Sequence, residues 1–188
     1  MRIITGKAKG IRLETLAGET TRPTAERVKE AVFSMIQFDI EGRRVLDLFA
    51  GSGQMALEAL SRGAREAVMI DRSKEAVSII NKNVQKTKLV AESKVFCMDY
   101  SEYIRRFSLE KFDIVFLDPP YAAGLYAPAL SALLSAEMLK STSIIVCESD
   151  SKEIFAKDPS LAERFVEVKV SKYSKTVITL LSPILKGE

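Results

Sequence analysis

After Gly42, short apolar runs alternate with segments whose apolar positions recur with the helical period of three to four residues. The runs have the length of buried strands and lie at 45–50, 67–71, 94–99, 112–118 and 143–149. The helical segments between them lie at 54–64, 74–87, 100–107 and 127–136. Strand–helix repeats of this kind build a parallel sheet with helices on both faces. The pattern therefore predicts a doubly wound α/β domain.

The C-terminal part of the chain departs from this alternation. Segments 165–170 and 176–181 are both strand candidates, and only a short polar link joins them. Such a link is too short for a crossover helix, so the two strands must pair as an antiparallel hairpin. We therefore expect residues 41–188 to form a Rossmann-like, seven-stranded, mostly parallel sheet with a C-terminal antiparallel hairpin.

Residues 1–40 are expected to form a small extension that differs in pattern and in charge. Residues 1–20 hold two extended pieces separated by glycines, which indicates a hairpin, and a helix is expected over 24–38 behind Pro23. The net charge of the whole chain is only +3, but this extension is basic. Its cations include Arg2, Lys7, Lys9, Arg12, Arg22 and Arg27. On charge alone, a solvated basic segment is a commoner explanation than a nucleic-acid surface.

The composition is that of an ordinary globular protein, with 47% apolar and 28% charged residues. No apolar run approaches the ~20 residues that span a bilayer, and the start of the chain lacks the apolar segment of a signal peptide. Cys97 and Cys147 lie inside apolar runs, which indicates two reduced core thiols. The chain has no histidine, so no metal site is expected. These features indicate a cytoplasmic protein, with a monomer as the default state.

The first predicted strand of the main domain ends in a glycine loop. Gly51, Gly53 and Ala56 match the pattern G-x-G-x-x-G/A, a tight turn at which a ligand can approach the backbone. Asp71 ends the second strand about 20 residues after Gly51, where a carboxylate can hold ribose hydroxyls. Asp99 ends the third strand. A tight structural turn alone would explain the glycines, but acids at the ends of adjacent strands favour a nucleoside-binding crevice.

Asp47 bears on which nucleoside this crevice would bind. It lies just before the glycines, where it would repel the pyrophosphate that dinucleotide folds place on the helix N-terminus. A carboxylate there suits a cationic ligand, such as the ammonium-bearing methionine part of S-adenosylmethionine. Asp47 could instead hold the loop by accepting backbone N–H groups, and both roles stay open at this point.

The fourth predicted strand leaves the core through an unusual corner, Asp118-Pro119-Pro120-Tyr121. The exocyclic amine of a nucleobase is a poor nucleophile, because its lone pair is delocalised into the ring. The Asp118 carboxylate and the Pro119 carbonyl could hold both amine protons, while proline fixes the backbone and removes a competing N–H. Tyr121 offers a face on which a base can stack. A rigid strand exit is the alternative, but beside the glycine loop we interpret this corner as the catalytic site.

In combination, the stretches RIITGKAKGIRL, TRPTAERVKEAVFSMI, DLFAGSG, LEALSRGA and DPPY resemble the RsmD family. Its members are class I S-adenosylmethionine-dependent methyltransferases that act on the N2 amine of a guanine in 16S rRNA. The resemblance implies that Asp118, Pro119 and Tyr121 are catalytic. It implies a cofactor site formed by Asp47, Phe49, Ala50, Gly51, Gly53, Asp71, Arg72, Asp99 and Tyr100. It also implies contacts to 16S rRNA, within an assembled or assembling 30S subunit, from Arg2, Lys7, Lys9, Arg12, Arg22, Thr24 and Arg27.

Other activities stay open on the residues alone. Another amino-methyltransferase could act on adenine N6 or on a different rRNA guanine, although DNA enzymes of this group usually carry a separate target-recognition domain. A protein-glutamine methyltransferase would favour asparagine at position 118, and a carbon-5 pyrimidine methyltransferase needs a loop cysteine. A non-catalytic RNA-binding assembly factor could keep the same fold. A NAD-dependent dehydrogenase is disfavoured by Asp47 and by the absence of a histidine or Tyr-x-x-x-Lys proton donor.

Overall fold

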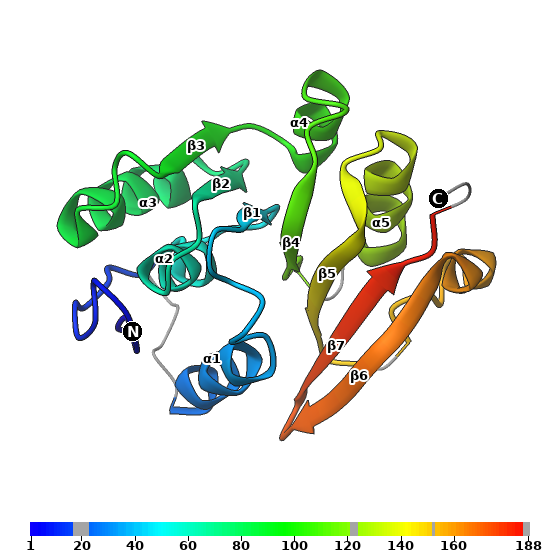
Figure 1. The fold of residues 1–188 in the computed structure, drawn as a ribbon, viewed down its shortest axis with the longest axis horizontal. Helices are drawn as coiled ribbons and strands as arrows, with labels where there is room; N and C mark the ends of the chain where they lie inside the picture. The colour runs from blue at the N-terminus through cyan, green and yellow to red at the C-terminus, as the bar shows by residue number, and fades with distance from the viewer. Residues whose placement is uncertain (17–22, 121–123, 152, 186–188) are drawn as a thin grey trace.

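The computed structural model describes residues 1–16, 23–120, 124–151 and 153–185, which include a seven-stranded sheet (Figure 1). The strands are β1 (Arg44–Asp47), β2 (Glu66–Asp71), β3 (Ser93–Cys97), β4 (Phe112–Leu117), β5 (Leu139–Ser149), β6 (Phe165–Tyr173) and β7 (Thr176–Pro183). They lie in the order β3-β2-β1-β4-β5-β7-β6. Strands β1 to β5 run parallel, whereas β7 is antiparallel to both β5 and β6. The predicted doubly wound sheet with a C-terminal hairpin is confirmed.

Helices cover both faces of this sheet (Figure 1). They are α1 (Pro23–Met35), α2 (Gln54–Ser61), α3 (Lys74–Thr87), α4 (Tyr100–Arg106), α5 (Tyr126–Ser135) and the 3-10 helix η2 (Pro159–Arg164). One apolar core lies between the sheet and α1, α2 and α3, and includes Phe33, Leu57 and Ile80. The second core lies under α4 and α5 and includes Ile104 and Leu130. Among the described residues, no helix is long and apolar enough to cross a membrane.

The N-terminal arm, residues 1–16, is packed against the main domain. The Ile3 N–H donates to the Ile11 carbonyl and the Leu13 N–H to the Met1 carbonyl, each at 2.9 Å. These bonds pair the two extended pieces as a hairpin would, although only an isolated bridge forms, between Arg2 and Arg12. Ile3 and Leu13 are buried in the core that α1 and α2 share. The arm therefore belongs to the same packed layer as the helix behind the glycine loop.

Several element boundaries differ from the sequence expectation. The strand predicted over 45–50 ends at Asp47, because the chain turns through residues 48–53. Strand β5 starts at Leu139, before the apolar run, because the buried Leu139 already pairs with Phe112 of β4. The expectation that both cysteines are core thiols is wrong for Cys97. That residue ends the outer strand β3 and is exposed, whereas Cys147 is buried.

Candidate active site

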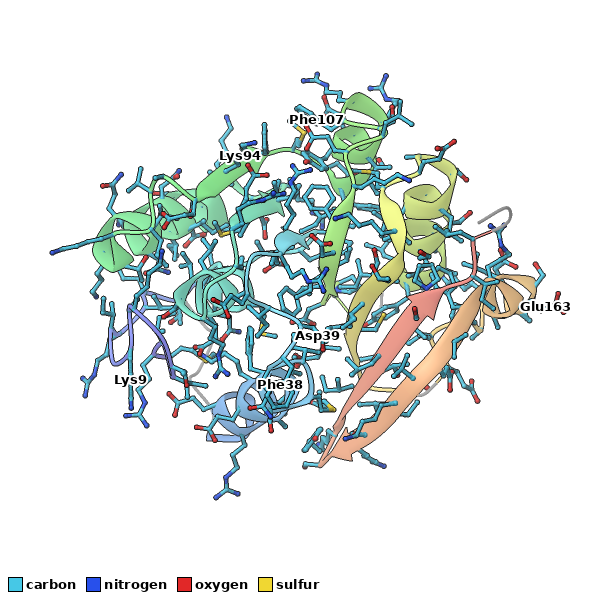
Figure 2. All side chains as sticks on the ribbon, in the orientation of Figure 1. Lys9, Phe38, Asp39, Lys94, Phe107 and Glu163 are labelled. Atoms are coloured by element: carbon cyan, nitrogen blue, oxygen red, sulfur yellow. The ribbon has the colours of Figure 1, made fainter. Side chains whose placement is uncertain are left out.

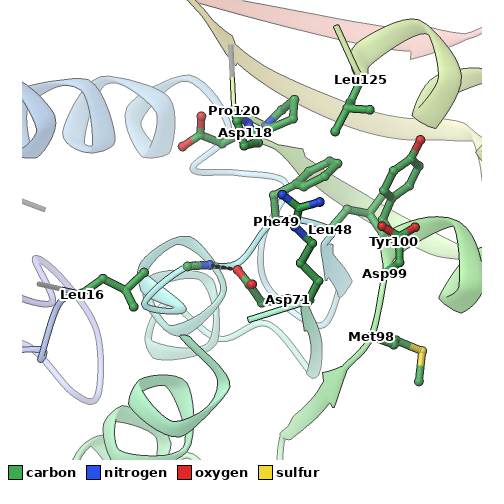
Figure 3. A pocket seen from close by; sticks show the side chains of 13 residues that line it. Leu16, Leu48, Phe49, Asp71, Met98, Asp99, Tyr100, Asp118, Pro120 and Leu125 are labelled. Atoms are coloured by element: carbon green, nitrogen blue, oxygen red, sulfur yellow. Dashed lines mark hydrogen bonds between the residues drawn. The ribbon is translucent and has the colours of Figure 1, made fainter. Parts of the chain in front are cut away.

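A cavity of about 520 Å³ opens where the carboxyl ends of β1, β2, β3 and β4 meet (Figure 3). This is the point at which the chain order reverses between β1 and β4, the place where open α/β sheets bind ligands. The predicted site residues that line the cavity are Phe49, Gly51, Asp71, Arg72, Asp99, Tyr100, Asp118 and Pro119. Five other residues line it. Pro120 and Leu48 lie within the predicted corner and loop but had no individual role, and Leu16, Met98 and Leu125 were not predicted.

The glycine loop is held in place by hydrogen bonds from its own backbone. The Gly51 N–H donates to Oδ2 of Asp71 at 2.9 Å, while Oδ1 of Asp71 accepts from the Ser73 N–H at 2.8 Å. Both carboxylate oxygens therefore have a fixed orientation at the cavity wall. Gly53 has a φ of 76°, and a Cβ built there would lie 3.1 Å from Sδ of Met69. Glycine is required here for backbone conformation and for space.

Asp47 lies behind the loop, outside the set of residues that line the cavity. Only 3% of it is exposed, and its carboxylate accepts backbone hydrogen bonds from Phe49 and Ala56. Burial, with a smaller contribution from the nearby charge of Asp71, raises the pKa of Asp47 to about 7. Of the two roles left open by the sequence, the geometry favours the one in which Asp47 holds the loop. Ala50 and Gly53 likewise shape the turn and do not line the cavity.

The far side of the cavity combines a carboxylate with aromatic rings. Asp99 caps α4, where its Oδ1 accepts from the Ser101 N–H at 2.8 Å. The rings of Phe49 and Tyr100 lie 5.2 Å apart, centre to centre, at an angle of 46°. A flat heterocycle can stack on such rings while a carboxylate accepts from its amine or hydroxyl groups. With a carboxylate acceptor beside aromatic walls, this side of the cavity suits a nucleoside.

Asp118 and Pro119 reach the same cavity from the end of β4. Asp118 is exposed and Pro119 is buried. Figure 3 shows the Asp118 side chain above Phe49, at the rim opposite Asp71. The third predicted catalytic residue, Tyr121, lies outside the described residues. Asp118 and Pro119 therefore line the same cavity as Gly51 of the glycine loop.

The predicted RNA-binding residues lie on the surface wherever the structure describes them. Lys9, Arg12 and Arg27 are exposed, and Lys9 projects from the arm in Figure 2. Two others form ion pairs, Arg2 with Glu26 at 3.6 Å and Lys7 with Glu92. Arg22 and the side chain of Thr24 lie outside the described residues.

The N-terminal arm contributes to the cavity through Leu16. Just before Leu16, the arm is tied to the glycine loop by Asn83, a fully buried residue of α3. The Asn83 amide donates to the carbonyls of Glu14 and Ser52, each at 2.9 Å, and its oxygen accepts from the Glu14 N–H at 2.8 Å. No motif marks Leu16 or Asn83, so the sequence could not have identified them.

A buried carboxylate on α2 holds the other end of the arm. Glu58 is fully buried and accepts from the backbone N–H groups of Ile4 and Thr5, at 2.8 and 3.1 Å. It also forms ion pairs with Lys29 of α1 at 3.4 Å and with Arg62 at 2.9 Å. Burial lowers the pKa of Lys29, although the adjacent Glu58 opposes that effect. Glu58 thereby joins the arm and α1 to the helix that follows the glycine loop.

The sheet order, the glycine loop after β1 and the acid at the end of β2 define a class I S-adenosylmethionine-dependent methyltransferase. The profile of one protein family, described as conserved hypothetical protein 95, matches residues 1–182. The chain therefore belongs to that family, the RsmD family, which confirms the resemblance seen in the sequence.

Individual relatives agree with this placement. The chain is 35% identical to ribosomal RNA small subunit methyltransferase D of Haemophilus influenzae, over 80% of this chain and 79% of that protein. It is 31% identical to the Escherichia coli protein of the same name, over 80% and 75%. Among solved structures, Escherichia coli yhhF superimposes with a TM-score of 0.83 at 27% identity, over 97% of each chain. A Thermus thermophilus protein gives a TM-score of 0.77 at 28% identity, over 96% and 98%.

Proposed function

We propose that this protein transfers a methyl group from S-adenosylmethionine to the exocyclic N2 amine of a guanine in 16S rRNA. The observation that carries the proposal is that Asp118 and Pro119 line the same cavity as Gly51 and Asp71. One cavity thus brings together a nucleoside-type loop and a pair of acceptors suited to an amine. The relatives named as small subunit rRNA methyltransferases supply the substrate class.

The lining of the cavity fits the cofactor. Asp71 presents oriented carboxylate oxygens that can accept from ribose hydroxyls, and the Phe49 and Tyr100 rings can contact the adenine. Asp99, which lies beside Tyr100, can accept from the adenine amine. Asp47 supports this site from behind the loop. When bound, the cofactor supplies an electrophilic methyl group on a positively charged sulfur.

The Asp118–Pro119 corner acts on the amine. A guanine amine has two N–H donors, and the Asp118 carboxylate with the Pro119 carbonyl provides two acceptors at fixed positions. Holding both protons directs the nitrogen lone pair out of the ring plane and toward the cofactor side of the cavity. Methylation leaves a surplus proton on nitrogen, which the Asp118 carboxylate can accept. Chemistry on a base requires that it leave its stack, so the target guanine must be flipped out of its RNA.

The basic residues of the arm and α1 would hold the RNA backbone around the flipped guanine. Lys9, Arg12 and Arg27 are exposed and carry charges that can contact phosphates. Because the arm also borders the cavity at Leu16, phosphates held on it lie on the same side as the reacting base. So small a basic surface favours a folded subunit, an assembled or assembling 30S particle, over naked RNA. A monomer suffices for this arrangement.

The test is transfer of labelled methyl to small ribosomal subunits that lack the modification. Wild-type protein should yield N2-methylguanine, and Asp118→Ala should lose at least about 100-fold in rate while keeping its cofactor affinity. Glu163→Ala is the matched control, since Glu163 is an exposed acid on η2, away from the cavity (Figure 2). Label recovered in adenine would redirect the proposal to N6 methylation. No transfer despite cofactor binding would favour a non-catalytic RNA-binding factor.

A further inference from the structure

Glu148 is the neighbour of Asp118 across two paired strands. In the parallel pair of β4 and β5, Leu117 lies opposite Cys147. Asp118 follows Leu117 just past the end of β4, and Glu148 follows Cys147 within β5, so the two residues lie side by side at this edge of the sheet. Adjacent strands lie about 4.8 Å apart, which places the two residues within reach of a single base.

Both side chains leave the sheet on the same face. Phe116 and Val146 belong to the core under α1, whereas Leu117 and Cys147 belong to the opposite core. Side chains alternate along a strand, so the residue that follows Cys147 returns to the α1 face. Glu148 also pairs with Ile178 of β7, another member of the core under α1. The arm and α1, which carry the predicted RNA-binding residues, are packed on this face.

The surroundings of the Glu148 carboxyl group disfavour its charged form. It is partly buried, and desolvation raises its pKa. From the described part of the chain, no hydrogen bond or ion pair reaches its carboxylate. A carboxyl group with a raised pKa beside a cavity residue such as Asp118 is a candidate functional group, because perturbed pKa values cluster at functional sites.

The backbone of Glu148 is fixed relative to the cavity. The hydroxyl of Tyr126 donates to the Glu148 carbonyl. Tyr126 begins α5, and the residue before it, Leu125, lines the cavity beside Pro120. The end of β5 is thereby held beside the Asp118–Pro120 corner, although Glu148 itself is not among the residues that line the cavity.

We propose that Glu148 is a specificity-determining residue that accepts a hydrogen bond from N1–H of the target guanine. This inference rests on the proposed guanine-N2 activity. In guanine the N1–H donor lies next to the N2 amine, so one carboxylate can hold N1 while Asp118 holds the amine. In adenine N1 is an acceptor, and a carboxylate facing it would be repelled. The pair of acids thus recognises an edge that carries adjacent donors, which guanine has and adenine lacks.

The test compares guanine with 2-aminopurine at the methylated position of the subunit RNA. 2-Aminopurine keeps the amine on carbon 2 but has an acceptor at N1. Wild-type protein should prefer guanine on the order of 10- to 100-fold in kcat/KM. Glu148→Gln can donate an amide N–H to the acceptor N1, so its preference should fall to near unity or reverse. Glu163→Gln is the control and should behave as the wild type.

The outcomes separate this proposal from the proposed function. If wild-type protein methylates no guanine, the proposed function fails before Glu148 is tested. If guanine is methylated but Glu148→Gln loses activity equally on both bases, Glu148 only supports Asp118 and the inference is overturned. An unchanged preference in Glu148→Gln overturns it as well. Cofactor affinity, measured by calorimetry, should be the same in all variants and reports that the fold is intact.

Discussion

The backbone N–H of Gly51 donates a 2.9 Å hydrogen bond to Oδ2 of Asp71, which links the turn after β1 to the end of β2. One carboxylate thereby fixes the loop and lines the cavity. Asp71→Ala should weaken S-adenosylmethionine binding on the order of 10- to 100-fold, because it removes a charged acceptor and releases the loop. Asp71→Asn keeps one acceptor oxygen, so its affinity for S-adenosylmethionine should lie between those of the wild type and Asp71→Ala. Calorimetric titration measures both, and unchanged affinity in Asp71→Ala would rule out this role.

Two glycines allow conformational strain to be separated from crowding. Gly53 and Gly10 have similar φ values, 76° and 84°, but a Cβ at Gly10 meets nothing within 4 Å. A Cβ at Gly53 would approach Sδ of Met69 and the Ile80 side chain at 3.1 and 3.3 Å. Gly10→Ala should cost about 1 kcal/mol of unfolding free energy, from backbone conformation alone. Gly53→Ala should lower the free energy of unfolding by more than Gly10→Ala does, as measured by urea denaturation. It should also reduce cofactor affinity, as measured by titration. Equal losses of unfolding free energy in the two variants would contradict steric crowding at Gly53.

Stability should depend on pH through Asp47. Its pKa is raised from 3.8 to about 7 in the folded protein, so between these values the folded state keeps a proton that the unfolded state has lost. The free energy of unfolding contributed by Asp47 must therefore fall as pH rises, by at most about 1.4 kcal/mol per pH unit, and level off above pH 7. Asp47→Asn lacks this titration. Urea denaturation of both proteins from pH 5 to 8 should show the wild type losing stability relative to the variant. Parallel curves would contradict the prediction.

Asn83 provides a test of coupling between the arm and the cofactor loop. Asn83→Ala removes the bonds to Glu14 and Ser52 and leaves the buried Ser52 carbonyl unpaired, at about 1–3 kcal/mol. We expect lower stability and, although Asn83 does not line the cavity, weaker cofactor binding. Asn81→Ala is the control, because Asn81 is exposed on the same helix. Cofactor affinity that stays at the wild-type value in Asn83→Ala would show that the loop holds its shape alone.

Exposed cations of the arm should act on RNA alone. Replacing Lys9 and Arg12 by alanine should weaken binding to the subunit and reduce the slope of log K against log salt by about 1 for each phosphate that is no longer neutralised. Cofactor affinity should not change. Lys172→Ala, an exposed change on β6, tests for an effect of net charge alone. If the slope of log K against log salt is the same in the wild type and the double variant, the RNA does not bind at Lys9 and Arg12.

The sequence predicted the sheet well because its signals are local. Buried strands such as β4 are continuous apolar runs, and acids at strand ends meet wherever parallel strands share an edge. Two features depend on long-range packing, which leaves no local pattern in the sequence. They are the place of Leu16 in the cavity wall and the hydrogen bonds made by Asn83. The sequence did not identify Glu148 for a related reason. Its importance comes from lying beside Asp118, and the register of β4 and β5 is visible only in the folded sheet.

Glu58 belongs to the helix behind the cofactor loop, but its buried carboxylate is engaged by the arm and by Lys29 of α1. A chain that began at residue 41 would leave the buried Glu58 carboxylate without its partners in the arm and in α1. Removing one partner of a buried ion pair lowers the free energy of unfolding by about 3–5 kcal/mol. Under the proposed function, the arm that would bind RNA therefore also supports the cofactor loop, and it cannot be removed as a separate module. A lineage that changed its RNA target would have to resurface the arm one residue at a time, because a grafted segment would have to rebuild the support of the cofactor loop as well.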